Sequence, residues 1–116
     1  MKLTDDETKE LHQYFKHTIN YYSDNPEEPI DPLSYVAPDG DNCLHIASFN
    51  GDYRIVELLI KSSCIDINAT GDMGDTPLHY AYRRKHNDII KLLLKYGASD
   101  EIINEFRKKP SEYLNS

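Results

Sequence analysis

The chain has 116 residues, of which 39% are apolar and 28% are charged, and its formal net charge is −7. The length is that of one domain, and the apolar content is too high for a wholly disordered chain. The acidic balance argues against nucleic acid or an anionic membrane as the main partner, and no apolar run approaches the ~20 residues that a membrane helix needs.

The first residues are acidic and contain no apolar signal core, and the only two cysteines are Cys43 and Cys64. Two cysteines are too few for a disulfide framework, so we expect a reduced, cytoplasmic setting. Acidic residues concentrate in the first 38 positions. They represent either solvated surface or a negative face that steers a basic protein partner.

The first predicted element is an amphipathic helix over residues 5–22. Residues 4–7 (TDDE) have the pattern of a capping box, and apolar side chains then recur at helical spacing. Residues 23–26 (SDNP) predict the end of this helix, and prolines then favour an extended linker. We expect residues 1–38 to form a capping helix and linker, and the alternative is a mobile helix that binds a partner. The linker side chains Leu33, Tyr35 and Val36 are expected to pack against the first unit of the repeat described next.

The remainder of the chain contains an internal repeat. Residues 43–47 (CLHIA) align with residues 77–81 (PLHYA) at an offset of 34, and residues 55–61 align with residues 89–95 at the same offset. Beyond this point the offset becomes 33, which predicts one extra residue in a loop near Ser62. The apolar spacing predicts two short helices in each unit.

The second unit carries the clearest helix signals. Thr76 suits an N-cap, and Pro77 suits the first helical position, where no amide hydrogen is required. Residues 89–94 are nearly all apolar, so their helix should be buried between neighbours. Gly97 is expected in a left-handed conformation at the end of this helix, and residues 72–75 (DMGD) predict a turn before the unit.

Residues 76–81 (TPLHYA) fulfil the T-P-L-H-x-A pattern, and the chain therefore resembles the ankyrin repeat family, whose period is 33 residues. The resemblance implies an all-α solenoid with full repeats at 39–70 and 71–104 and a truncated repeat at 105–116, capped by the N-terminal helix. Lys85 stands where this family usually has a glycine. A left-handed backbone at Lys85 would cost about 1 kcal/mol.

The resemblance also implies a structural role for His45 and His79, each of which is the histidine of an L-H-x-A motif. Their side chains would hydrogen-bond the backbone around the turns and order one repeat against the next. The sequence has no Cys-x-x-Cys pair, nucleophile elbow, phosphate-binding glycine loop or His-Glu-x-x-His motif. We therefore predict no enzymatic activity, no cofactor and no bound metal.

In ankyrin proteins, the turn tips and the ends of the first helices line a concave recognition surface, so the resemblance implies that this chain binds another protein there. Carried over position by position, the partner-binding residues are Asp39, Asp41, Phe49, Asn50, Asp72, Met73, Asp75, Tyr82, Arg83, Arg84 and Phe106. A large exposed apolar side chain indicates an interface, and the alternative for Phe49 is that it packs beneath a neighbouring turn.

We expect a monomer that binds a protein partner and neither nucleic acid nor a membrane. The alternative function is an immunity or antidote-type inhibitor, which would neutralise a basic toxin or enzyme by covering its active site. Charge reversal at both Arg83 and Arg84 should weaken partner binding at nearly unchanged stability.

Overall fold

The computed structural model describes residues 2–16 and 31–114. The described residues form five α-helices: α1 (Asp5–Phe15), α2 (Cys43–Asn50), α3 (Tyr53–Ser62), α4 (Pro77–Arg83) and α5 (Asn87–Lys95). Two short 3-10 helices are also present, η2 (Asp72–Gly74) and η3 (Pro110–Tyr113). Within the described ranges there is no β-strand, only an isolated antiparallel bridge between Val36 and Asn42. The predicted all-α class is confirmed.

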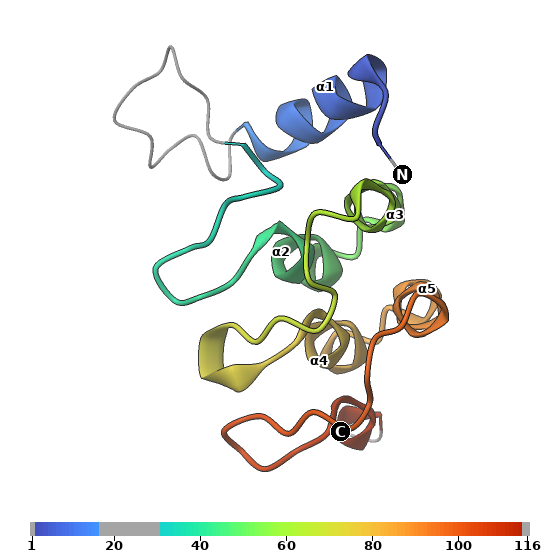
Figure 1. Ribbon diagram of the computed structural model, residues 1–116. Helices are drawn as coiled ribbons and strands as arrows, with labels where there is room; N and C mark the ends of the chain where they lie inside the picture. Colours follow the sequence, from blue (N-terminus) through green and yellow to red (C-terminus); the bar gives the residue numbers. More distant parts are fainter. Residues whose placement is uncertain (1, 17–30, 115–116) are drawn as a thin grey trace.

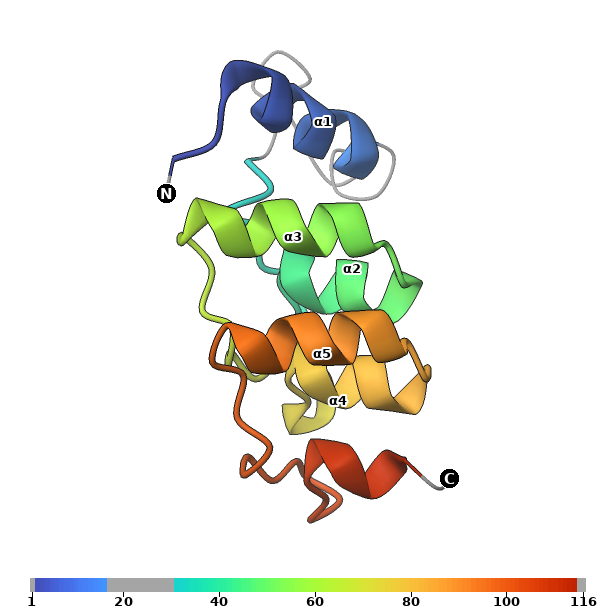
Figure 2. The same ribbon diagram turned by 90° about the vertical axis from the view of Figure 1, so that its right-hand side faces the viewer.

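The helices stack as repeated pairs (Figures 1 and 2). Each predicted full repeat contributes one pair, α2 with α3 and α4 with α5. The first helices, α2 and α4, form an inner layer that continues into η3, whereas α1, α3 and α5 form an outer layer. The chain therefore adopts the predicted repeat solenoid.

The core lies between and within these layers. Its largest fully buried apolar side chains are Leu11, Phe15, Leu44, Val56, Leu58, Leu59, Leu78, Ile89 and Leu93. Two of these belong to α1, which packs on α3 as α3 packs on α5. The structure describes the predicted N-terminal helix up to its C-cap, Lys16. Residues 17–22 of that prediction, and the linker through residue 30, lie outside the described residues.

The described end of the linker follows the prediction only in part. Leu33 and Tyr35 are half-buried against the core, as expected. The side chain of Val36, in contrast, is 63% exposed, which corrects the expectation for that residue. Its backbone pairs with Asn42, and because successive side chains of extended backbone point to opposite sides, Val36 turns outward where Tyr35 turns inward.

Left-handed residues make the tight turns of each repeat. Between the two helices of a repeat, this residue is Gly51 in the first (φ 79°) and Lys85 in the second (φ 60°). A Cβ on Gly51 would lie 2.6 Å from the ring of His86, so a larger residue there would displace this side chain. At the ends of the second helices, the equivalent residues are Ser63 (φ 59°) and Gly97 (φ 101°), which confirms the prediction for Gly97.

The motif histidines connect one repeat to the next. In His45, Nε2 lies 2.9 Å from the carbonyl oxygen of Asp75, and in His79, Nε2 lies 2.9 Å from that of Lys108. The Nδ1 atom of each ring accepts a hydrogen bond from the N–H of the N-cap residue three positions earlier, so Nε2 carries the proton and donates. Burial lowers the pKa of His45 and keeps this ring neutral. The structural role implied for both histidines is confirmed.

Candidate functional site

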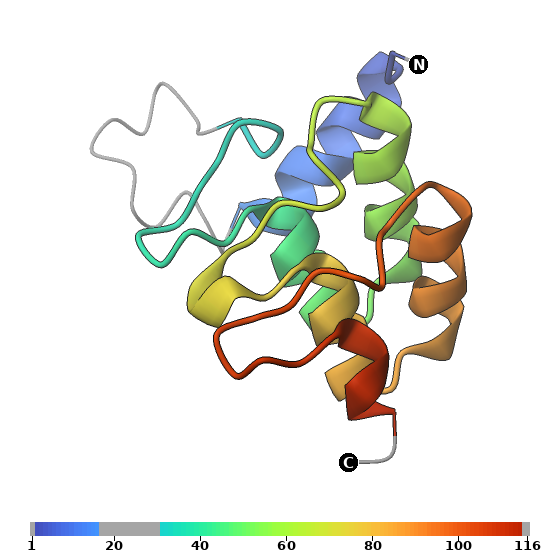
Figure 3. The same cartoon turned by 60° about the horizontal axis from the view of Figure 1, so that its bottom comes forward.

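Three hairpin turns project from the inner layer on the same side of the stack (Figures 1 and 3), and we call them fingers. They comprise residues 37–41, 71–75 and 104–108. Each is closed by the same backbone hydrogen bond, in which the N–H of its first residue donates to the C=O of its last residue, at 2.7, 2.8 and 3.1 Å respectively. The third finger therefore has the same form as the first two, although its sequence departs most from the repeat pattern.

The finger tips form a row of exposed side chains. The internal alignment makes Asp39, Met73 and Phe106 equivalent positions on successive fingers. Asp39 is exposed, and the exposed fractions of Met73 and Phe106 are 50% and 59%. The N–H of Glu105 donates to the C=O of Met73 at 2.9 Å, which holds the second and third fingers side by side. The row is thus acidic on the first finger and apolar on the other two.

A pocket of about 320 Å³ lies between the first two fingers and the inner helices. Five of the residues predicted to bind a partner line it: Asp41, Phe49, Asn50, Asp72 and Arg83. The other lining residues are His45, Ile46 and Tyr80. We call this pocket, together with the row of finger tips, the concave groove.

Tyr80 lines the pocket and was not identified from the sequence. Its hydroxyl donates to the carboxylate of Asp41, at 2.9 and 3.1 Å from the two oxygens, and its ring meets that of Phe49 edge to face at 5.8 Å. Burial raises the pKa of Tyr80, and the Asp41 carboxylate raises it further, so the hydroxyl stays protonated as a donor. Tyr80 occupies the variable position of T-P-L-H-x-A, and an aromatic residue at that position is the signal that the sequence offers.

The two neighbouring arginines have different surroundings. The guanidinium of exposed Arg84 lies 4.7 Å from the ring centroid of Phe49, and no described carboxylate forms an ion pair with it. Phe49 is itself 42% exposed, so it packs against its neighbours without being covered by them. Arg83, in contrast, donates from Nη2 to Oδ2 of Asp75 at 2.8 Å. We therefore expect charge reversal at Arg83 to lower stability, which replaces the expectation from the sequence.

Two of the predicted contact residues support the groove from within. The carboxylate of Asp75 is 2% exposed and is held by Arg83 and by Nδ2 of Asn104, at 2.8 Å each. Tyr82 is half-buried against the apolar core. Asn50, in contrast, is exposed at the edge of the pocket and donates from Nδ2 to the hydroxyl of Tyr14 on α1, at 3.2 Å.

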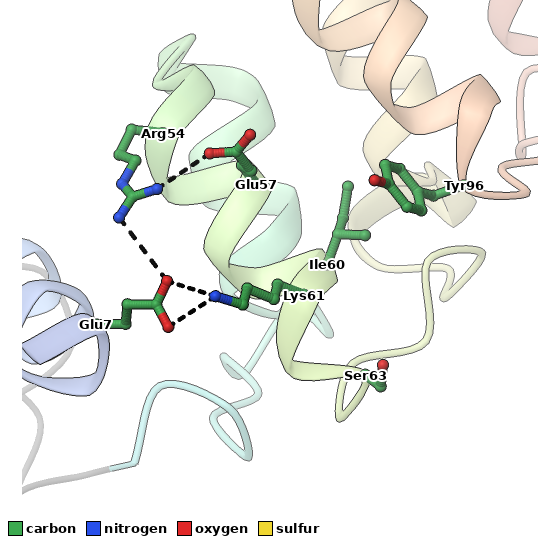
Figure 4. A pocket seen from close by; sticks show the side chains of 7 residues that line it. All are labelled: Glu7, Arg54, Glu57, Ile60, Lys61, Ser63 and Tyr96. Atoms are coloured by element: carbon green, nitrogen blue, oxygen red, sulfur yellow. Dashed lines mark hydrogen bonds and ion pairs between the residues drawn. The ribbon is translucent and has the colours of Figure 1, made fainter. Parts of the chain in front are cut away.

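A larger pocket, of about 500 Å³, lies on the outer layer beside α1, α3 and α5 (Figure 4). Its charged groups pair with one another. Lys61 Nζ lies 2.9 and 2.7 Å from the two carboxylate oxygens of Glu7, and Arg54 pairs with Glu57 at 3.1 Å and with Glu10 at 3.2 Å. The bond from Lys61 is the main cause that lowers the pKa of Glu7 to about 2. The pairs of Lys61 with Glu7 and of Arg54 with Glu10 attach α1 to α3, whereas the pair of Arg54 with Glu57 lies within α3, and we assign the larger pocket a structural role.

Among the residues that the structure describes, the remaining reactive side chains include those of metal-binding types and the buried thiol of Cys43. In the described part of the chain, no three His, Cys, Asp or Glu side chains are grouped so that they could hold a metal ion. Burial raises the pKa of the Cys43 thiol to about 12, so this cysteine is not a thiolate at neutral pH. Of the helices that the structure describes, none has the length and apolar character needed to cross a membrane.

Comparison with known proteins matches the repeats. A family model for ankyrin repeats in three copies matches residues 9–104. The chain is 33% identical over 87 residues, 75% of its length, to an ankyrin and IPT/TIG repeat-containing protein of Schizosaccharomyces pombe. It is 33% identical over 92 residues, 79% of its length, to alpha-latrocrustotoxin-Lt1a of Latrodectus tredecimguttatus. It is also 36% identical over 69 residues, 58% of its length, to the palmitoyltransferase ZDHHC17 of Danio rerio.

These matches cover 8%, 6% and 11% of the three relatives, so the similarity concerns their repeats and not the whole proteins. Repeats of this kind generally mediate protein–protein interaction and are typically non-catalytic. The matched region, the T-P-L-H-x-A motif and the stacked helix pairs agree, and the chain belongs to the ankyrin repeat family.

Proposed function

We propose that this chain binds a partner protein through the concave groove and carries out no chemistry on it. The observation that carries the proposal is the pocket itself, because five of the side chains implied by the family resemblance line it together. Phe49 in the pocket lining and Met73 and Phe106 on the finger tips are large apolar side chains with exposed fractions of 42%, 50% and 59%. Exposed aromatic and methionine side chains next to a concave surface are typical of protein interfaces.

The groove is held rigid by bonds between the repeats. The N–H of Asp72 donates to Oδ1 of Asp41 at 2.9 Å, which joins the first two fingers, and the motif histidines join each inner helix to the next finger. A surface that is ordered in advance binds without the entropy cost of arranging its own loops. This rigidity supports a role in presenting a fixed surface to a folded or extended partner.

We assign the direct contacts to two kinds of side chain: those that are exposed, and those that line the pocket and can still bind a partner group. Asp75 and Tyr82 are left out of this set, because both are engaged in the interior, and Arg83 contributes mainly by holding Asp75. The proposed contact residues are Asp39, Asp41, Phe49, Asn50, Asp72, Met73, Arg84 and Phe106. The acidic first finger and the net charge of −7 favour a partner that carries positive charge.

Two serine variants of the first repeat test the proposal. Phe49 in the groove and Tyr53 on the outer layer have nearly equal exposed fractions, 42% and 40%, so Tyr53→Ser is the matched control for Phe49→Ser. The partner is captured from an extract of the source cell, identified by mass spectrometry, purified and titrated against both variants. We expect Phe49→Ser to weaken binding by at least about tenfold, as for a buried aromatic anchor, and Tyr53→Ser to bind like the unaltered chain.

Equal affinity of Phe49→Ser and the unaltered chain, or loss of binding in Tyr53→Ser alone, would contradict the use of the groove. The circular dichroism of both variants checks that each is folded. If the captured partner is an enzyme or a toxin, its activity in the presence of the chain tests the inhibitor alternative directly. A partner whose activity is unchanged in the complex would exclude that alternative.

A further inference from the structure

We infer that the concave groove receives an extended segment of the partner in which a lysine or arginine lies about three residues from a large apolar side chain. The basic group lies against Asp41 and Asp72, and the apolar group lies between Met73 and Phe106. This inference rests on the proposed function and adds the chemistry and the spacing of the bound segment.

The pocket has an excess of negative charge. Asp41 receives hydrogen bonds only from neutral donors among the described residues, the hydroxyl of Tyr80 and the N–H of Asp72. The carboxylate of Asp72 accepts no hydrogen bond from the described residues, although it lines the same pocket. The one guanidinium in the lining belongs to Arg83, and its charge is paired with the buried carboxylate of Asp75. In the part of the chain that the structure describes, the carboxylates of Asp41 and Asp72 therefore have no cation as a partner.

The same pocket offers an aromatic wall for the stem of a basic side chain. The rings of Phe49 and Tyr80 meet edge to face at 5.8 Å beside the carboxylate of Asp41. Lysine and arginine bury their apolar stems along such surfaces while the charged end reaches a polar group. A lysine or arginine therefore fits both parts of the lining. A purely apolar side chain fits only the aromatic wall, and an acidic side chain is repelled by the two carboxylates.

Arg84 determines which way the segment lies. Arg84 is the C-cap residue of α4, and its guanidinium lies over the ring of Phe49 at 4.7 Å, whereas the carboxylates of Asp41 and Asp72 belong to the fingers. The basic side chain of the partner is therefore repelled by Arg84 at the helix end and attracted by the carboxylates of the fingers. The basic side chain of the partner should point to the fingers, and its backbone carbonyls or an acidic residue should face Arg84.

The spacing follows from the repeat geometry. The pocket lies between the first and second fingers, and the apolar tips Met73 and Phe106 belong to the second and third. Packed helices, and hence the fingers that they carry, are spaced about 8–10 Å apart. An extended chain advances about 3.3 Å per residue, so one repeat corresponds to about three residues of the bound segment.

A displayed library of random peptides, selected on the immobilised chain, tests the inference. We expect the selected sequences to share a lysine or arginine about three residues from a large apolar side chain. A selected peptide is then synthesised with a fluorescent label and titrated against two variants that each remove one negative charge. Asp72→Asn alters the pocket, and Asp6→Asn alters an exposed residue in the first turn of α1, on the outer layer.

We expect Asp72→Asn to weaken peptide binding about fivefold, and more at low than at high salt, whereas Asp6→Asn should leave the affinity unchanged. Replacing the lysine of the peptide with norleucine should weaken binding to the unaltered chain more than it weakens binding to Asp72→Asn, because only Asp41 then remains to attract the lysine. Met73→Ser should weaken binding of the same peptide through loss of apolar contact.

Three results would overturn the inference. They are selected peptides without a basic residue, equal affinities for Asp72→Asn and the unaltered chain, and a norleucine replacement that weakens binding to Asp72→Asn as much as it weakens binding to the unaltered chain. A library that yields no shared sequence would overturn it as well. None of these results bears on the proposed function, which is decided by the separate comparison of Phe49→Ser with Tyr53→Ser on the captured partner.

Discussion

Replacing Arg83 with methionine tests whether this residue acts in the interior of the groove. The guanidinium pairs with Oδ2 of Asp75 at 2.8 Å, and it lies 4.7 Å from the ring centroid of Tyr113 in the third repeat. Methionine retains an apolar stem of similar length and removes only the charge and its hydrogen bonds. The substitution therefore leaves the 2%-exposed carboxylate of Asp75 without its cation.

The expected loss of stability follows from how deeply Arg83 and Asp75 are buried. Removing one member of a fully buried ion pair costs about 3–5 kcal/mol. The Arg83 side chain is 34% exposed, and Asn104 still donates to the other oxygen of Asp75, so water and this amide offset part of the loss. We expect about 2 kcal/mol from the ion pair and about 0.5 kcal/mol from the lost contact with Tyr113. In a domain of this size, that corresponds to a fall in Tm of about 10 °C.

Urea denaturation followed by circular dichroism measures the change in the free energy of unfolding. Arg84→Met is the matched control, because among the described residues its guanidinium has no carboxylate partner and lies over the exposed ring of Phe49, and it should cost less than about 1 kcal/mol. Adding Asp75→Asn to Arg83→Met should recover part of the lost stability, because the uncompensated charge is removed. A loss below about 0.5 kcal/mol in Arg83→Met, or no difference between the two methionine variants, would refute the reasoning.

Three further predictions concern the scaffold. Leu93→Ala, at a fully buried position, should cost about 2–5 kcal/mol in urea denaturation through the cavity it leaves, and a loss under about 1 kcal/mol would contradict its place in the core. Lys85→Gly should raise stability by about 0.5–1 kcal/mol in thermal denaturation, because glycine adopts φ 60° without strain, and a lowered Tm would argue against this. Glu7 has a folded pKa of about 2 against an ordinary value of 4.5, so its contribution is complete above about pH 4.5 and is lost as the pH falls toward 2. Glu7→Gln should thus be less stable than the unaltered chain at neutral pH, and the difference should shrink over that range, whereas a constant difference would contradict the pairing with Lys61.

The resemblance to the ankyrin family implied the roles of the motif histidines, and the sequence by itself determined the repeat and the helix pairs. These features depend on short-range signals, such as the N-cap at Thr76, the proline that follows it and the left-handed glycine at position 97. Because the same signals recur at offsets of 34 and 33 residues, each repeat is interpreted with the help of the other. The fold class could be predicted for this reason without any knowledge of long-range contacts.

The tertiary structure alone decided which groove side chains remain available to a partner. Tyr80 reaches a carboxylate 39 positions earlier, and Asp75 is buried by Asn104, which lies 29 positions later on the next finger. The sequence places Asp41 and Asp75 at equivalent turns, yet the first stays in the pocket lining and the second is enclosed. The cause is stacking: whether a turn residue is covered depends on the side chains of the neighbouring repeat, and the order of residues within its own repeat does not contain that information.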